Sequence, residues 1–390
     1  MGQLRDYVAA GWLRQGDDAS DTHAGEQLLD AMTTVHPLQP FSRRYFSADA
    51  DARLFTYARE WRQAHSGHVA DAATAPLTPW KPDASISFAL LQGFLARPVR
   101  HFFNHRLKVY FNELDAETLD EEPFALDGLQ EHIAMDTVLR AAVTSGDARA
   151  AVNVAARQLS ERGVLPPAGF GELSRDMLAH AGADLATRWH NACARWPRID
   201  EKMEVLHEAH GVCLEDWLTD LRRGDDAPYM RLELAAGRLL RDQKFIRYDK
   251  ATNAWILHVV AHAMGLRMQT RILGRDASLI IKPLDSDDAT MCLNALLSSL
   301  REGMSKALPI ARKTAFAWLQ HGIEQPEKAN KQALQAYEGS GQPSHRGEVG
   351  EDPYLARAWP RFDALEAGGF QHWLSLYAPM CGAIQQERAS

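Results

Sequence analysis

Alternating strand and helix patterns in the second half of the chain constrain its fold more than any other feature. Paired strands are expected over residues 205–218, and residues 230–235 alternate between apolar and polar or small positions, as in a half-buried strand. A helical pattern covers residues 252–264, and the alternation returns at residues 268–272 before a short apolar run at 278–281. This strand–strand–helix–strand order predicts a mixed α/β (α+β) fold.

The composition limits the kinds of protein that this chain can be. Its 390 residues are 46% hydrophobic and 24% charged, which suffices for two or three domains. Since the net charge is −8, any contact with DNA must be local. We expect neither membrane insertion nor secretion, because no apolar stretch approaches a span of about 20 residues. Four cysteines without a Cys-x-x-Cys pair indicate free thiols and a cytoplasmic location.

A basic edge is predicted beside an apolar helix face near residue 100. Pro98 suits the first turn of a helix, and apolar residues from Val99 to Tyr110 repeat at helical spacing. The repeat is typical of an amphipathic core helix, but basic residues interleaved with aromatics also suit DNA phosphates. The candidate contacts on the other face are Arg97, Arg100, His101, His105 and Lys108.

Two histidines one helical turn apart, His258 and His262, form half of a zinc site. A zinc protease would need Glu at position 259, which is Val, and the pattern offers no third ligand. His207 and His210 lie nearby in sequence, but among sixteen histidines four will often fall close together by chance. We therefore expect no metal site, although a metalloprotein remains a third hypothesis. No motif for a serine or cysteine nucleophile is present.

Two further predictions concern the C-terminal part. Asp285 or Ser286 is expected to cap a helix whose leucines, from Leu293 to Met304, form one core-facing stripe. Residues 339–353 are rich in glycine and polar residues, which indicates a long flexible loop before the last helices.

An ordered series of strings resembles a known family. His36–Phe46 and Phe94–Phe111 are similar to the C-terminal third of the RecC family, the gamma subunit of the bacterial RecBCD helicase-nuclease (exodeoxyribonuclease V), and shorter strings follow in the family's order up to residues 350–354. The resemblance implies two parts. Residues 1–83 would be a helical connecting region, the remnant of a helicase-like part, and residues 84–390 a RecC C-terminal nuclease-like domain with helical insertions.

The resemblance also implies a restriction-endonuclease-like core, of the PD-(D/E)XK type, that lacks its catalytic set and is embedded in many helices. Active members place an Asp on one strand and Asp/Glu-x-Lys on the next; the carboxylates hold Mg²⁺ and the lysine aligns the attacking water. Here Thr219 stands at the first position, and Glu233 and Ala235 replace Glu and Lys. Asp216 and Asp220 flank Thr219, but on a strand Asp220 would point to the opposite face.

The function implied is that of a non-catalytic subunit of the RecBCD complex. It would guide and split DNA at double-strand breaks and scaffold RecB-like and RecD-like subunits for recombinational repair. Its partners would be double- and single-stranded DNA, with Mg²⁺ and ATP used only by the partner subunits. Chi recognition by this chain alone is not expected. The alternative is a Mg²⁺-dependent DNA exonuclease that acts in its own right through Glu233.

Overall fold

The computed structural model describes residues 2–18, 20–47, 53–65, 77–111, 124–322, 324–340 and 346–387. The chain divides into two compact units, Met1–Ala75 and Pro76–Ser390. The sequence-based boundary between residues 83 and 84, and the origin of the first part in a helicase-like region, stay predictions. No helix in the described ranges is both long and apolar enough to cross a membrane.

The first unit has little apolar core in its described residues. Its only buried hydrophobic residue there is Ala24, whereas Leu38 and Tyr57 are 92% and 88% exposed. So little burial does not offset the entropy of ordering a chain of this length. The elements are α1 (Gly2–Gly11), α2 (Ala24–Met32), the 3-10 helices η1 (Arg43–Tyr45) and η2 (Arg59–Trp61), and α3 (Arg62–His65).

The second unit contains a five-stranded mixed sheet and two hairpins. In the sheet the order is β3 (Arg222–Arg223), β4 (Tyr229–Leu234), β7 (Met268–Leu273), β8 (Ser278–Ile281) and β9 (Ile384–Gln386), with β4 and β7 parallel and the other neighbours antiparallel. The antiparallel hairpins are β1 (Met203–Ala209) with β2 (Val212–Leu218) and β5 (Leu240–Arg241) with β6 (Phe245–Ile246). The strands predicted from alternation are confirmed.

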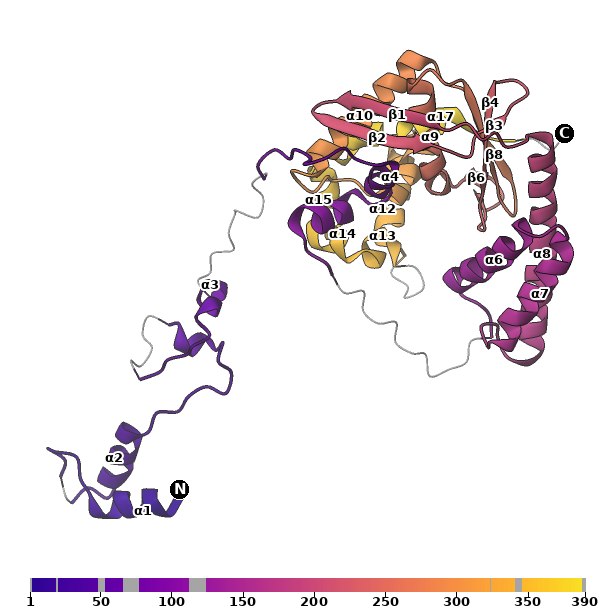
Figure 1. The fold of residues 1–390 in the computed structure, drawn as a ribbon. Coiled ribbons are helices and arrows are strands. Elements are labelled where there is room, and N and C mark those ends of the chain that lie inside the picture. Colours follow the sequence, from indigo (N-terminus) through magenta and orange to yellow (C-terminus); the bar gives the residue numbers. More distant parts are fainter. Residues whose placement is uncertain are drawn as a thin grey trace. The chain divides into compact units, whose positions relative to one another are not determined.

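The sheet separates two apolar cores. Met230 and Leu232 of β4 pack with the three helices α6 (Gly128–Val143), α7 (Ala148–Glu161) and α8 (Ala168–Arg195). Tyr229 and Ala235 instead contact the core around α9 (Thr252–Ala263), which joins the parallel strands β4 and β7. Figure 1 shows α6, α7 and α8 grouped beside the strands β3, β4 and β8. The predicted mixed α/β class is therefore confirmed.

Helices complete the second unit, and one of them bears out the predicted cap. Asp285 caps α10 (Ser286–Gly303) by accepting a hydrogen bond from the backbone N–H of Asp287, and the leucine stripe of α10 is buried. The other helices are α4 (Phe88–Ala96), α5 (Pro98–His101), the π-helix η4 (Phe102–Leu107), η5 (Tyr248–Lys250), α11 (Arg312–Leu319), α12 (Pro326–Glu338), α13 (Gly347–Glu351), α14 (Pro353–Ala358), α15 (Phe362–Ala367), α16 (Phe370–Trp373), η6 (Leu374–Leu376) and α17 (Ala378–Ala383).

The predicted helix face near residue 100 is wrong in two places. Pro98 does occupy the first turn of α5, but the helix winds as a π-helix from Phe102 and ends at Lys108, whose φ is 56°. Tyr110, predicted to share the core face, lies beyond the end of the helix and is 66% exposed. His101, predicted on the basic edge, is the last residue of α5, before the π-helix, and is 5% exposed.

The long loop predicted over residues 339–353 is also wrong in part, because α13 forms within it; residues 341–345 of the prediction lie outside the described residues. Glu348 on α13 explains why this polar segment folds. Its two carboxylate oxygens accept hydrogen bonds from the backbone N–H groups of Lys313 (3.1 Å) and Thr314 (2.8 Å), and one also accepts from the Thr314 hydroxyl. Glu348 thus satisfies unpaired donors at the start of α11, a long-range cap that sequence periodicity does not reveal.

Candidate functional site

Two of the three positions predicted for a degenerate nuclease centre, Thr219 and Glu233, contact one arginine, Arg231. On β4 its Nε lies 2.7 Å from Glu233 Oε1, and one of its Nη atoms donates a 2.7 Å hydrogen bond to the Thr219 carbonyl. The side chains of Arg231 and Glu233 are 12% and 33% exposed. Since they are two residues apart on a strand, they share one face of the sheet. A guanidinium therefore lies between the position of the first Asp and the retained Glu.

The local backbone structure determines where Thr219 and Ala235 lie. Thr219 lies after the end of β2 and before β3, at a break where Asp220 has a φ of 59°, so the expectation that it stands within a strand is wrong. Ala235 continues the pairing of β4, since its N–H donates to the Leu273 carbonyl at 2.8 Å, and its side chain packs against the α9 core. A methyl group thus stands where the family pattern has an amine.

The two aspartates that flank Thr219 have other partners. Asp216 accepts a hydrogen bond from the backbone N–H of Phe88 at 2.8 Å, at the start of α4. Asp220 forms a 2.7 Å ion pair with Arg198. Mg²⁺ in an active centre of this kind needs two or more oxygen ligands beside substrate phosphates. In this geometry Glu233 is paired with a cation of the chain itself, and neither aspartate is paired with Arg231 or Glu233.

His258 and His262 are core residues with hydrogen-bonded rings. Nε2 of His258 lies 2.9 Å from the Lys282 carbonyl, which can only accept, so Nε2 donates and Nδ1 accepts from the Thr270 hydroxyl at 3.0 Å. Nε2 of His262 likewise donates to the Met268 carbonyl at 2.8 Å. Burial lowers the pKa of His258 to about 3 and also lowers that of His262. Across the described ranges, no group of three or more His, Cys, Asp or Glu side chains is arranged to hold a metal.

The predicted basic edge is only partly a basic surface. Arg97, His105 and Lys108 are exposed, whereas Arg100 is half-buried with its guanidinium 5.2 Å from the centre of the Tyr354 ring. His105 stacks on buried His101 with the ring centres 4.1 Å apart. Burial, and then the charge of Lys108, lower the pKa of His105. Its imidazole is thus a poor cation at neutral pH.

Two carboxylates also stand near the arginines of this edge. Arg97 and Arg100 line a small cavity together with Glu348 and Asp352. Opposite charges so close reduce the attraction of these arginines for phosphates. The five predicted residues are therefore neighbours in space, but they do not form a uniformly basic face.

Sequence reasoning missed a stronger concentration of cations in residues 238–250, here called the cationic segment. It comprises the β5–β6 hairpin and η5, and a hollow of about 500 Å³ lies between it and α11. Arg238, Arg241, Arg247 and Lys313 line this hollow, together with Tyr248 and Phe316. A second hollow of about 590 Å³ shares Arg238, Leu240 and Asp242 with the first. A count of charges in a moving window would have found the segment, but not the hollows.

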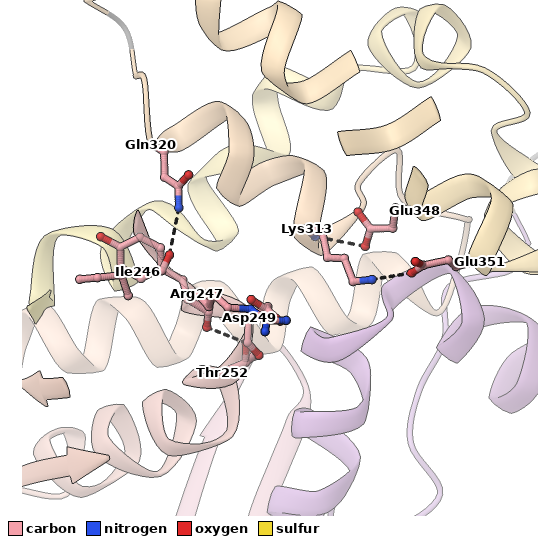
Figure 2. A network of polar contacts seen from close by, with 9 residues as sticks. Ile246, Arg247, Asp249, Thr252, Lys313, Gln320, Glu348 and Glu351 are labelled. Carbon is pink, nitrogen blue, oxygen red and sulfur yellow. Dashed lines mark hydrogen bonds and ion pairs between the residues drawn. The ribbon is translucent and has the colours of Figure 1, made fainter. Parts of the chain in front are cut away.

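Side-chain bonds from neighbouring elements hold the cationic segment. Gln320, directly after α11, donates to the Ile246 carbonyl at 2.9 Å and accepts from Arg241 at 3.1 Å. Asp276 accepts from the backbone N–H groups of Leu239 (2.7 Å) and Leu240 (3.1 Å). Figure 2 shows Gln320 reaching Ile246. At the start of α11, the side chain of Lys313 is directed toward Glu351 of α13.

Comparison with known proteins identifies the family. A family model described as the RecC C-terminal domain matches residues 83–323. The RecBCD enzyme subunit RecC of Escherichia coli (strain K12) is 29% identical over 372 residues, which cover 92% of this chain. The same match covers 31% of that relative, so the chain spans about a third of its length. These matches agree with the resemblance seen in the sequence, and the chain belongs to the family of RecC C-terminal domains.

Proposed function

We propose that this chain acts as a non-catalytic part of a RecBCD-type helicase-nuclease, in which it guides DNA and scaffolds RecB-like and RecD-like subunits during recombinational repair of double-strand breaks. The carrying observation is the placement of the Arg231 guanidinium between the Thr219 carbonyl and Glu233. A fixed cation there neutralises the one retained carboxylate, and Ala235 supplies no amine to align a water.

The strand order supports a restriction-endonuclease-like core beneath this centre. The β1–β2 hairpin continues beyond Leu218, because Ile199 and Arg223 make further backbone hydrogen bonds across it, to Leu221 and Pro197. The chain then runs through β4 and α9 into β7, which is parallel to β4. A three-stranded meander followed by a helix and a parallel strand is the arrangement we infer for the degenerate nuclease-like core. Mg²⁺ and ATP are proposed to serve the partner subunits only.

One observation favours the alternative of a Mg²⁺-dependent exonuclease. Glu233 remains on β4 with a third of its side chain exposed, so solvent and ions can reach it. A lone carboxylate that already pairs with an arginine holds a hydrated Mg²⁺ weakly, and this weighs against the alternative.

The test is to incubate the purified chain with end-labelled linear duplex and single-stranded DNA in Mg²⁺ and to follow nucleotide release. We expect no release from the wild type or from Glu233→Ala. Release that scales with wild-type protein and disappears in Glu233→Ala would replace the proposal with the exonuclease. Association is tested separately, by co-purification of the chain with the RecB-like subunit of the same organism. Failure to associate would contradict the scaffolding role.

A further inference from the structure

The cationic segment has a net positive charge, although the whole chain has a net negative charge. Residues 238–250 contain five cations, Arg238, Arg241, Lys244, Arg247 and Lys250, and two carboxylates, Asp242 and Asp249, so five minus two gives +3 where the whole chain carries −8. A protein of negative net charge binds a polyanion only where such a local excess of cations exists. The segment is therefore the first place to look for an anionic ligand.

The cations of this segment are weakly paired within the protein. The nearest carboxylates lie 3.9 Å from Arg241 (Asp242) and 3.7 Å from Arg247 (Asp249), both much longer than the 2.7 Å pair of Arg231. At these distances, at partly exposed sites, the ion pairs contribute little. Burial lowers the pKa of Lys250, and among its charged neighbours Asp249 raises it while the cations Arg247, Arg312 and Lys313 lower it. Lys313 is paired with Glu351, so the excess of positive charge lies in the segment itself.

The shape of the region suits an extended strand. The two hollows of about 500 and 590 Å³ share three lining residues, so they adjoin one another beside the hairpin. Phe245 lines neither hollow but lies beside Arg241, which lines the first; the charged groups of Arg241 and Lys244 are 5.6 and 5.4 Å from the Phe245 ring centre. Aromatic rings beside cations are the usual platform for unpaired bases and their phosphates.

We propose that the cationic segment binds the phosphodiester backbone of single-stranded DNA. Arg238, Arg241 and Arg247 contact successive phosphates, and the two adjoining hollows accommodate the sugars and bases. The inference rests on the proposed function, since a strand reaches this surface only in a chain that handles DNA. It goes further by placing the contact on residues outside the degenerate centre and outside the predicted basic edge.

The test measures binding of a labelled oligothymidine of about 16 nucleotides by fluorescence anisotropy over a series of salt concentrations. In the full chain, Arg238→Ala, Arg241→Ala and Arg247→Ala are combined in one variant. Each lost contact with a single strand removes about 0.7 from the slope of log K against log salt, so three contacts remove about 2. We expect affinity to fall at least about tenfold at physiological ionic strength.

A matched variant removes the same charge elsewhere: Arg149→Ala, Arg157→Ala and Arg162→Ala, three exposed arginines on or directly after α7. It is expected to keep nearly wild-type affinity and salt dependence. An equal loss in both variants would overturn the proposal in favour of general electrostatic attraction. Equal binding of a duplex of the same length, or displacement of the oligonucleotide by poly-glutamate, would overturn the assignment to single-stranded DNA. Thermal melting of each variant shows that both remain folded.

Association with the RecB-like subunit distinguishes failure of the proposed DNA site from failure of the proposed subunit role. Wild type that associates and binds the oligonucleotide, with binding lost only in the cationic-segment variant, supports both. Wild type that associates, while the cationic-segment variant keeps full affinity for the oligonucleotide, removes this site and leaves the subunit role standing. Wild type that binds the oligonucleotide without associating supports the site and contradicts the scaffolding role.

Discussion

Arg231 and Arg241 stand a short way apart in the chain, on β4 and β5, and their guanidinium groups have opposite surroundings. The side chain of Arg231 is 12% exposed, and its guanidinium donates hydrogen bonds to Glu233 and to the Thr219 carbonyl. The side chain of Arg241 is 49% exposed and makes a long contact to Asp242, one hydrogen bond to Gln320 and a contact with the Phe245 ring. A buried cation needs partners inside the protein, whereas an exposed cation beside a hollow keeps its charge for a ligand. Position in the fold, more than residue type, decides which role a basic side chain has.

The same contrast extends to the groups around each arginine. Arg231 belongs to a polar layer between the sheet and α9, which we define as Arg231, Glu233, His258, His262 and Thr270. In this layer the polar side chains pair with each other or with backbone carbonyls. The cationic segment, in contrast, holds its backbone with Gln320 and Asp276 and leaves most of its cations outward. The layer is expected to control stability, and the segment to control binding.

The largest effect on stability is expected from His258→Ala. His258 is fully buried and joins Thr270 to the Lys282 carbonyl, so the truncation leaves a cavity and unpaired groups. We expect a loss of about 3 kcal/mol in the free energy of unfolding, measured by urea denaturation. The control His180→Ala, at an exposed position on α8, is expected to stay within about 0.5 kcal/mol of wild type. Similar losses at both positions would mean that the layer has no special role in stability.

Removing the cation of the layer is expected to have the next largest effect. Arg231→Ala leaves a partly buried carboxylate at Glu233 and an unpaired carbonyl at Thr219. We predict a loss of about 2 kcal/mol in urea denaturation. Arg140→Ala is the matched control, because Arg140 pairs with Asp136 at a similar distance of 2.6 Å but is 80% exposed. It is expected to lose less than about 0.5 kcal/mol. If the two losses were equal, burial of the Arg231 pair would not matter.

Acid is expected to weaken the polar layer in a predictable direction. The pKa of His258 falls from 6.5 to about 3 on burial, so the unfolded chain takes up a proton there before the folded one does. The stability that it contributes is complete above pH 6.5 and is lost as the pH falls toward 3. Wild type should therefore lose up to about 1.4 kcal/mol per pH unit more than His258→Gln in this window. Parallel pH–stability curves for the two proteins would refute the assignment.

The triple alanine variant of the cationic segment is expected to have the smallest effect on the free energy of unfolding and the largest effect on DNA binding. The variant that replaces Arg238, Arg241 and Arg247 by alanine removes exposed or half-buried side chains whose ion pairs are long. Its free energy of unfolding should change by less than about 0.5 kcal/mol, while its affinity for oligothymidine falls as proposed above. A variant that unfolds as readily as Arg231→Ala would place these arginines in the same structural class as the polar layer.

Much of the sheet could be predicted from the sequence, because strand and helix periods are local. The alternation at Met230 and Leu232, the helix that became α9 and the cap at Asp285 all depend on neighbours within a few residues. The α13 helix was missed because its cause is distant: Glu348 caps a helix that starts more than thirty residues earlier in the chain, at Arg312. A composition rich in glycine gives no sign of such a contact.

The candidate sites were less predictable for the same reason. The sequence predicted the loss of catalytic residues at Thr219, Glu233 and Ala235. It could not predict the hydrogen bond from Arg231 to the Thr219 carbonyl, because that bond depends on how β4 packs beside the end of β2. The sequence did contain a signal for the ion pair, because Arg231 and Glu233 are two residues apart on a strand and so share one of its faces. The cationic segment showed no hairpin motif, because Asp242 and Gln243 take left-handed conformations (φ of 52° and 56°) that turns usually assign to Asn or Gly.

The two backbone bonds to Asp276 have a consequence for the cationic segment. The β5–β6 ladder is only two residues long on each strand, too short to set its own direction. Asp276, in the turn between β7 and β8, fixes the start of the hairpin, and Gln320 fixes its return strand. The arginines are therefore carried on a backbone that is ordered before any ligand arrives. Binding then does not have to order this backbone, so less conformational entropy opposes the contact with a strand.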